Sequence, residues 1–577
     1  MNAPHDQSQR DRFVGELEQN FSVVASAGSG KTRAITDRIV ALAQHEHAAE
    51  WLPSLVVVTY TNRAAAEMQQ RARQSTLEAG VKLEVLNAFN RAFFGTIHSL
   101  CLKLLRQHGH YLGLPAQLEH LDESNDAALW TEFVQNSTAL GAELDTEQRH
   151  ALLRLTPARR LLDLGRWGHV PEMPPAPGPF PTFDFEAVYA FAPDKRSQAA
   201  ASRSQEALRR WEAAWAGEGF VGPFPECASK PLLATWEAAL SPIAQWRQRA
   251  ALCVAAEIAR DYRRFRLARG FMTFGDQVAL AAELLQHPEA ARRIRTRNYR
   301  VILDEAQDTD PAQFNVLLEI TRPPEATGSW PTEQAAPPRP GHFCMVGDFQ
   351  QSIYGARADL AHYRRVHDAL LRTGGGAQLT FSVTFRLDEA AIAFANAVFP
   401  LVLHGDERQV SYVQLHPRPT VFPGQIIRFD PKPKTEDIVG RKNWQKMYWE
   451  ADQLARWLRD VGLENLRASS WQEVAVLCPR TRWLAPIRAA LRSVGLEAQV
   501  QSERAIRATA QLMPGSPLSS PSSPNRATAT KSSASSAKSS AFPITISPSF
   551  PRATESVFTS SRRHRAPVPL RRRSICS

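Results

Sequence analysis

Apolar positions along the chain gather in short runs, each followed by a polar or amphipathic stretch. The runs are FSVV (21–24), LVVVTY (55–60), RVIL (300–303) and FCMV (343–346). Short runs of this kind are typical of strands that are buried on both faces. After the first run, Ile35, Ile39 and Leu42 recur at helical spacing. Strands that alternate with helices predict a parallel α/β sheet whose functional sites lie at the carboxyl ends of its strands.

The pattern changes in three places. Between residues 111 and 260, helix-like stretches alternate with proline-rich breaks such as 171–181, which predicts a helical insertion. A second proline-rich break, 322–341, predicts a surface loop between two strands. WQEVAVLCPRTR (471–482) predicts a strand that enters a loop before an amphipathic helix. From residue 508 the chain is rich in Ser, Pro, Ala and Arg, and such a segment cannot bury enough apolar surface to fold.

These changes divide the 577 residues into five segments. They are a first α/β part (1–110), the helical insertion (111–260), a second α/β part (261–376), an incomplete second α/β unit (377–507) and a disordered basic tail (508–577).

Net charge and cysteine content exclude only a few kinds of site and partner. Of the net charge of +11, residues 508–577 contribute ten Lys/Arg and one acid, which leaves +2 for residues 1–507. Net charge therefore says little about partners of the folded part. The six cysteines form no CxxC pair, so neither a zinc site nor a disulfide framework is indicated. The first twenty residues are polar and no run is long enough to span a membrane, so we expect a cytoplasmic protein without a membrane partner.

Residues 25–32, ASAGSGKT, follow the first predicted strand and open a helix, which is the context of a phosphate-binding loop. Its members are Ala25, Ser26, Ala27, Gly28, Ser29, Gly30, Lys31 and Thr32. Backbone N–H groups aimed by the glycines would cradle phosphates, Lys31 would reach the β/γ-phosphates, and Thr32 would ligate Mg²⁺. Ala25 stands where the pattern has Gly, which is tolerable if that position needs no positive φ. A Gly-rich turn without a ligand is the alternative.

The apolar run at 301–303 is followed directly by Asp304 and Glu305 in the stretch VILDEAQDTD. An apolar strand that ends in two acids matches a Walker B arrangement, with Asp304 holding Mg²⁺ and Glu305 orienting and deprotonating the attacking water. A solvated acidic turn is the alternative for this stretch alone. Together with the loop, the acids indicate hydrolysis of a nucleoside triphosphate such as ATP.

Three further stretches lie in a fixed order around these motifs: TYTNRAAAEMQQR (59–71), GTIHSLCLKLLR (95–106) and MVGDFQQSIYGARADL (345–360). The set resembles superfamily 1 helicases of the UvrD/Rep type, and ASAGSGKT with LTFSVTFRL (379–387) is similar to the RecB/AddA branch of helicase–nucleases. The resemblance covers residues 5–505. It implies a P-loop NTPase with a RecA-like sheet, a helical insertion and an incomplete second RecA-like domain. The implied activity is ATP-dependent 3′–5′ translocation and unwinding of single-stranded or 3′-tailed DNA in repair or recombination, and a second helicase–nuclease subunit is an implied partner.

The resemblance also assigns individual residues. On the nucleotide side, Gln7 matches the adenine-reading glutamine or belongs to a plain polar terminus, and Arg33 matches a base-side contact. Gln351 matches a γ-phosphate sensor, while Arg386 matches an arginine that stabilises transition-state charge or is a surface arginine. On the DNA side, aromatic platforms and short donors hold single strands. The matching positions are Tyr60, Thr61, Asn62, Arg63, Thr96, His98, Ser99, Tyr354 and Arg357, of which Tyr354 is either a platform or packs under the nucleotide.

The sequence departs from the family pattern at two places. Ala356 replaces an aromatic before Arg357, and Ala358 replaces the Gly after it. After residue 400 we find neither the fifth motif nor the sixth, which carries a second catalytic arginine. The stretch 508–577 is either a native basic extension or the product of a frameshift. We therefore expect slow ATP hydrolysis, and the alternative function is a non-catalytic ATP- and DNA-binding fragment or subunit.

Overall fold

The computed structural model describes residues 3–136, 141–168, 174–331, 334–351, 360–373, 375–403, 412–431, 443–500 and 542–548. The chain divides into two compact units, Met1–Ile426 and Ile427–Ser577, which we describe separately.

The first unit is built on a parallel six-stranded sheet with the strand order β3-β2-β6-β7-β1-β8. The strands are β1 (Asn20–Ala25), β2 (Leu55–Thr59), β3 (Phe93–Thr96), β6 (Arg300–Asp304), β7 (Phe343–Gly347) and β8 (Gly376–Phe381). Strands β1, β2, β6 and β7 coincide with the four apolar runs of the sequence. The α/β fold with a parallel RecA-like sheet is thereby confirmed.

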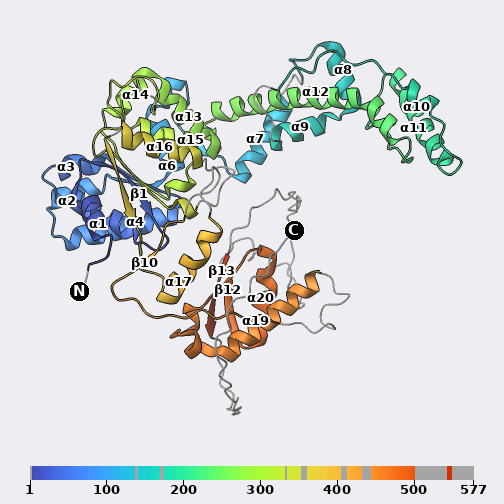
Figure 1. Ribbon diagram of the computed structural model, residues 1–577. Coiled ribbons are helices and arrows are strands. Elements are labelled where there is room, and N and C mark those ends of the chain that lie inside the picture. Colours follow the sequence, from blue (N-terminus) through green and yellow to red (C-terminus); the bar gives the residue numbers. More distant parts are fainter. Residues whose placement is uncertain are drawn as a thin grey trace, which may run out of the picture. The chain divides into compact units, whose positions relative to one another are not determined.

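Two helical layers cover the sheet (Figure 1). One layer contains α1 (Gln7–Gly15), α2 (Lys31–Gln44) and α4 (Asn62–Glu78), and the other contains α6 (Ile97–His108), α13 (Phe274–Gln286), α14 (Pro288–Arg295), α15 (Pro311–Glu319) and α16 (Leu360–Arg372). Alternate side chains of β2 serve the two layers, because Val56 and Val58 pack in one core and Val57 in the other. Ile35 and Ile39 of α2 are fully buried, and each such side chain contributes about 1.5–3 kcal/mol.

The helical insertion comprises α7 (Glu123–Asn136), α8 (Thr146–Leu155), α9 (Ala158–Trp167), α10 (Glu186–Ala190), α11 (Gln198–Ala216) and α12 (Leu233–Ala268). It has its own aromatic core, in which Trp211, Trp236 and Trp246 are buried. The chain leaves the α/β part at β4 (Glu119–His120) and returns at β5 (Phe271–Met272), and these two strands pair. The boundary expected at residue 260 falls inside α12, because the helix continues without interruption to Ala268.

Two further expectations differ from the structure. The second α/β unit was expected from residue 377, but β8 pairs with β1 and belongs to the first sheet. The proline-rich break 322–341 is no plain surface loop, because Arg322 and Trp330 are buried. Arg322 donates to the backbone oxygens of Ala336, Gly328 and Thr327 within the loop, and its ion pair with Glu319 of α15, at 2.7 Å, ties the loop to the body of the unit.

After β8 the first unit continues through β9 (Val383–Thr384), α17 (Glu389–Val398) and β10 (His416–Pro417). The second unit contains α19 (Asn443–Leu466), β11 (Ala475–Cys478), α20 (Leu484–Ser493) and β12 (Leu496–Val500). The strand and helix predicted around residues 471–482 correspond to β11 and α20. Within the tail expected to be disordered, the structure describes only Phe542–Pro548, as strand β13 paired antiparallel with β11 and β12.

Candidate functional site

The loop between β1 and α2 has the backbone of an anion cradle. Gly28 and Gly30 have φ values of 70° and 77°, which side-chain-bearing residues adopt only with strain. The Ser29 amide donates to Ser26 O at 3.1 Å, and α2 begins at Lys31, so the first N–H groups of the helix point toward the loop. Ala25 ends β1 and has no positive φ, which is the condition stated above for alanine to replace glycine there.

Buried hydroxyls show that this cradle suits a phosphate. The Oγ atoms of Ser26 and Ser29 are buried and have no hydrogen-bond partner. A buried hydroxyl without a partner costs free energy, and phosphate oxygens would satisfy both. The loop therefore fits the phosphates of a nucleotide on grounds that are independent of its sequence pattern.

Lys31 and the acids at the end of β6 form one network. Lys31 Nζ lies 3.1 Å from Glu305 Oε2, and Gln307 Nε2 donates to the same oxygen at 2.8 Å. Glu305 has a φ of 54°, a left-handed conformation that is uncommon for glutamate. The structure thus brings together Lys31 and Glu305, which lie 274 residues apart in the chain.

The neighbouring carboxylates are held in an environment that disfavours their charge. Burial and the charge of Glu305 raise the pKa of Asp304 to about 7. Burial also raises the pKa of Asp348, which follows β7, to about 6. Perturbed carboxyls in such a position are typical of functional sites. Asp348 was missed in the sequence, although it follows a buried strand of the same sheet as Asp304 does.

Gln351 lies in a short helix directly after Asp348, and its backbone N–H donates to Asp348 O at 3.0 Å. Its side chain is exposed. Of the other residues predicted from the same stretch, Tyr354 and Arg357 lie outside the described residues. No cluster of three or more metal-ligating His, Cys, Asp or Glu side chains occurs in the described parts of the chain.

The segment after β8 lies directly on the loop. Phe385 N donates to Gly28 O at 2.8 Å, and a Cβ at Gly30 would lie 3.5 Å from the Phe385 ring. A Cβ at Gly28 would lie 3.0 Å from Cβ of Arg386, so the predicted Arg386 is placed beside the loop. Phe385 was missed in the sequence, although an aromatic next to the predicted arginine was a signal for it.

Helix α1 fixes this segment from the other side. The buried Asp6 accepts two hydrogen bonds of 2.8 Å from Arg10 and one of 3.1 Å from Val383 N. Arg10 lies 4.5 Å and 5.2 Å from the ring centres of Phe381 and Phe385. Its guanidinium is therefore packed between α1 and the segment that borders the phosphate loop.

The two glutamines of α1 differ in their surroundings. The predicted Gln7 donates to Asp11 at 2.7 Å on the exposed side of the helix. Gln9 instead accepts from Thr380 N at 2.5 Å and so contacts β8. Arg33, predicted on the base side, is 88% exposed and pairs loosely with Asp37 at 3.7 Å.

The predicted DNA contacts follow β2 and β3 at the same edge of the sheet. Tyr60 is 52% exposed, and Asn62 and Arg63 are exposed at the start of α4. Three of the predicted short donors also have a local role, since Thr61 caps α4 and Thr96 and Ser99 form a capping box at the start of α6. His98 is half-buried and contacts the Phe274 ring edge-on, with the ring centres 5.0 Å apart. The exposed Phe274, missed in the sequence, adds a second ring beside His98.

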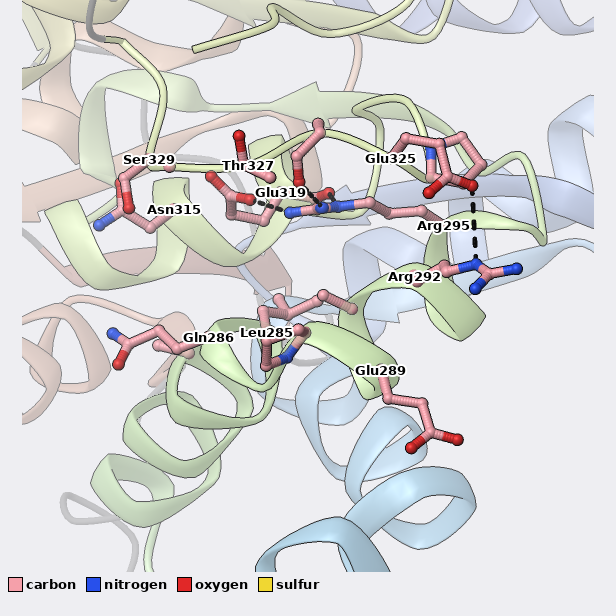
Figure 2. A pocket seen from close by; sticks show the side chains of 16 residues that line it. Leu285, Gln286, Glu289, Arg292, Arg295, Asn315, Glu319, Glu325, Thr327 and Ser329 are labelled. Carbon is pink, nitrogen blue, oxygen red and sulfur yellow. Dashed lines mark hydrogen bonds and ion pairs between the residues drawn. The ribbon is translucent and has the colours of Figure 1, made fainter. Parts of the chain in front are cut away.

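A cavity of about 530 Å³ lies between α13, α14, α15 and the loop that follows residue 322 (Figure 2). Its lining includes none of the phosphate-loop residues. Arg295, at this cavity, pairs with Glu319 and donates to Ala326 O at 2.7 Å, and the rim pair Arg292–Glu325 is 3.6 Å apart. The guanidinium groups of Arg295 and Arg292 at this cavity are thus already paired with carboxylates of the protein.

No helix in the described ranges is long and apolar enough to cross a membrane.

Comparison with known proteins agrees with this geometry. Residues 6–368 match the sequence model of the UvrD/REP helicase N-terminal domain. The chain is 26% identical over 512 residues to an ATP-dependent helicase/nuclease subunit of Desulforudis audaxviator, a match that covers 70% of this chain and 40% of that relative. It is 40% identical over 121 residues to DNA helicase II of Haemophilus influenzae (21% and 16% of the two chains). Over 127 residues it is 31% identical to the ATP-dependent DNA helicase SRS2 of Saccharomyces cerevisiae (22% and 10%). The chain thus spans less than half the length of these relatives.

Proposed function

The chain belongs to the UvrD/REP helicase family, and on that premise we propose that it couples ATP hydrolysis to movement along single-stranded DNA. The observation that carries the proposal is the contact between Lys31 of the phosphate loop and Glu305 at the end of β6. Two separate motifs of the sequence meet there, at the carboxyl edge of a parallel sheet where such folds bind ligands.

The free chain holds Lys31 and Glu305 in an ion pair, and both are available to a nucleotide. The phosphates would occupy the loop, satisfy the hydroxyls of Ser26 and Ser29, and take Lys31 as their cation. Glu305, released from Lys31, would orient the attacking water and accept its proton. Gln307, which already donates to Glu305 at 2.8 Å, would keep the carboxylate in position.

Thr32 and Asp304 are the residues that would hold Mg²⁺. The ion would neutralise charge that develops on the phosphate oxygens. Asp304 must lose its proton to become a ligand, and its raised pKa makes this step dependent on pH near neutrality.

The segment Phe385–Arg386 supplies the other side of the nucleotide site. Phe385 offers an exposed ring to the base, and Arg386 is placed to stabilise charge on the transferred phosphoryl group. An arginine in that role contributes about 10³–10⁵ in rate. Gln9 accepts from Thr380 N of the preceding strand β8, whereas the predicted Gln7 donates to Asp11. Gln351 is the proposed phosphate sensor.

For DNA binding, we assign single-stranded DNA to the rings of Tyr60, His98 and Phe274, on which its bases can stack. Exposed polar groups at the start of α4 suit the sugar–phosphate backbone of the DNA. We propose 3′-tailed DNA as the substrate and 3′–5′ as the direction. Because one relative is named as a helicase/nuclease subunit, we propose a further subunit as the partner, with a role in repair or recombination. The described cysteines are all free thiols, which suits a cytoplasmic protein.

Steady-state ATPase of the purified chain, with and without single-stranded DNA, tests the proposal. We expect DNA-stimulated turnover that is lost in Lys31→Ala and retained in Lys230→Ala, which removes an exposed lysine of the insertion. Glu305→Gln is expected to bind Mg·ATP and not hydrolyse it. Nucleotide binding without turnover in the unaltered chain would instead identify a non-catalytic binding protein, and absence of both would refute the proposed site.

A further inference from the structure

Three aromatic side chains meet where the helical insertion joins the α/β part. Phe274, the first residue of α13, contacts His98 of α6 edge-on. Its ring also stacks on His120 of β4, with the ring centres 3.9 Å apart and the planes inclined by 28°. His98 is a predicted DNA contact, while neither the sequence nor the proposed function gives His120 a role.

The backbone holds His120 and Phe274 firmly. Strands β4 and β5 pair in parallel, with Glu119 N donating to Gly270 O and Leu121 N to Met272 O, both at 2.8 Å. Arg106 donates twice to Leu118 O, at 2.9 Å and 2.7 Å, just before β4. Thr273 and Asp276 form a capping box that fixes the start of α13. The two rings are therefore presented on ordered strands and helices.

Both rings are nevertheless open to solvent. Phe274 remains 55% exposed in spite of its two ring contacts, and His120 is also exposed. Single exposed aromatics are common on protein surfaces, but a stacked pair leaves an aromatic face open for a further ring. A flat ligand added to His120 would continue the stack that begins at Phe274.

The charges around His120 distinguish between two kinds of ligand group. Glu119 precedes His120 and is exposed. Backbone and side-chain hydrogen bonds from Asn125 and Ser124 lower the pKa of Asp122, which therefore carries a negative charge beside His120. Two carboxylates repel a phosphate and leave a neutral ring unaffected. The site consequently suits the face of a base more than the backbone of a nucleic acid.

We propose that His120 is a stacking platform for one base of single-stranded DNA, continuing the surface of His98 and Phe274 onto the root of the insertion. The inference rests on the proposed DNA-binding function and adds to it a contact outside the family motifs found in the sequence. Stacking on one aromatic side chain contributes about 1–3 kcal/mol per base, which corresponds to about 5- to 150-fold in affinity.

Fluorescence anisotropy with labelled oligothymidylate tests the proposal on the full chain. We expect His120→Ala to weaken binding by about 5- to 150-fold and His120→Phe to restore it, since the ring and not its nitrogens is used. His110→Ala is the matched control, because His110 is an exposed histidine whose ring contacts Tyr111 with centres 4.4 Å apart. Equal affinity of His120→Ala and the unaltered chain would overturn the inference, as would an equal loss in His120→Phe.

A second measurement separates stacking from a structural role. Abasic sites placed one at a time along the oligonucleotide should identify a position at which base removal weakens binding by the unaltered chain and has no further effect in His120→Ala. A purely structural role would give losses that add at every position, which would overturn the inference. If the unaltered chain binds no DNA at all, the proposed function fails, and this outcome is distinct from a chain that binds DNA equally with and without His120.

Discussion

Asp304→Asn is expected to stabilise the nucleotide-free chain while it removes ATP hydrolysis. Asp304 is 8% exposed, and burial together with Glu305 raises its pKa to about 7 from 3.8. Asparagine has nearly the same shape and keeps an oxygen that can accept the hydrogen bond of 3.0 Å from Glu305 N. The substitution therefore removes a buried charge without creating a cavity or losing an acceptor.

The size and pH dependence of the effect follow from linkage. A pKa of about 7 in the folded chain against 3.8 for the ordinary carboxyl corresponds to about 4 kcal/mol. Because the folded chain binds this proton more tightly, stability falls as the pH rises from about 4 to about 7 and stays low above it. The advantage of asparagine is therefore absent below about pH 4 and complete above about pH 7. For a unit of 426 residues, about 4 kcal/mol corresponds to a Tm increase of about 4 °C.

Thermal unfolding of both chains without nucleotide, at pH 8 and at pH 5, measures this effect. We expect a higher Tm for Asp304→Asn at pH 8, a smaller difference at pH 5, and no difference for Asp163→Asn, which changes an exposed acid of the insertion. A Tm of Asp304→Asn at pH 8 that is equal to or below that of the unaltered chain would refute the reasoning. It would mean that the buried charge of Asp304 does not destabilise the folded chain.

Three further substitutions test other contacts. Arg10→Ala should raise the KM for ATP several-fold with little change in kcat, because it removes the guanidinium that lies 5.2 Å from the ring of Phe385, the proposed contact of the base. An unchanged KM in steady-state ATPase measurements would contradict this prediction. Burial alone would raise the pKa of Asp276, but hydrogen bonds from two arginines and a threonine lower it to about 2. Asp276→Asn should therefore lower the free energy of unfolding by about 2 kcal/mol at pH 7 and by almost nothing near pH 2. Glu319→Gln leaves two buried arginines without their carboxylate and should lower the unfolding free energy by about 3–5 kcal/mol, whereas Glu325→Gln, at an exposed pair, should lower it by less than about 1 kcal/mol.

The central sheet could be predicted because its strands are buried on both faces and therefore read as unbroken apolar runs. Strand β8, GAQLTF, is an edge strand with polar positions, and nothing in its local pattern connects it to β1 rather than to the unit that follows. The same limit explains Trp330, whose burial depends on the packing of a proline-rich loop against distant helices. Pairing and burial of this kind are set by tertiary contacts that a local pattern does not contain.

The site divides in a similar way. Lys31, Asp304 and Glu305 lie in motifs where a strand or loop fixes the chemistry, so their spacing could be interpreted directly. The choice between Gln7 and Gln9 could not, because it depends on which side of α1 contacts β8. Phe385 and Phe274 were missed for the same reason, since an isolated aromatic gains significance only from the ring or loop beside it.

The instability at Asp304 and Glu305 also affects how the chain would bind Mg·ATP. Glu305 adopts a left-handed backbone conformation, which costs about 1–3 kcal/mol for a residue with a side chain, next to a carboxyl whose burial disfavours its charge. Both features make the free chain less stable, and both lie where Lys31, the phosphates and Mg²⁺ would gather. A cation bound at Asp304 would relieve the burial cost, so part of the binding free energy of Mg·ATP would offset an instability already present in the fold. At the same concentration of free Mg·ATP, bound nucleotide should therefore stabilise the unaltered chain more than Asp304→Asn, and this difference should shrink as the pH falls below about 7.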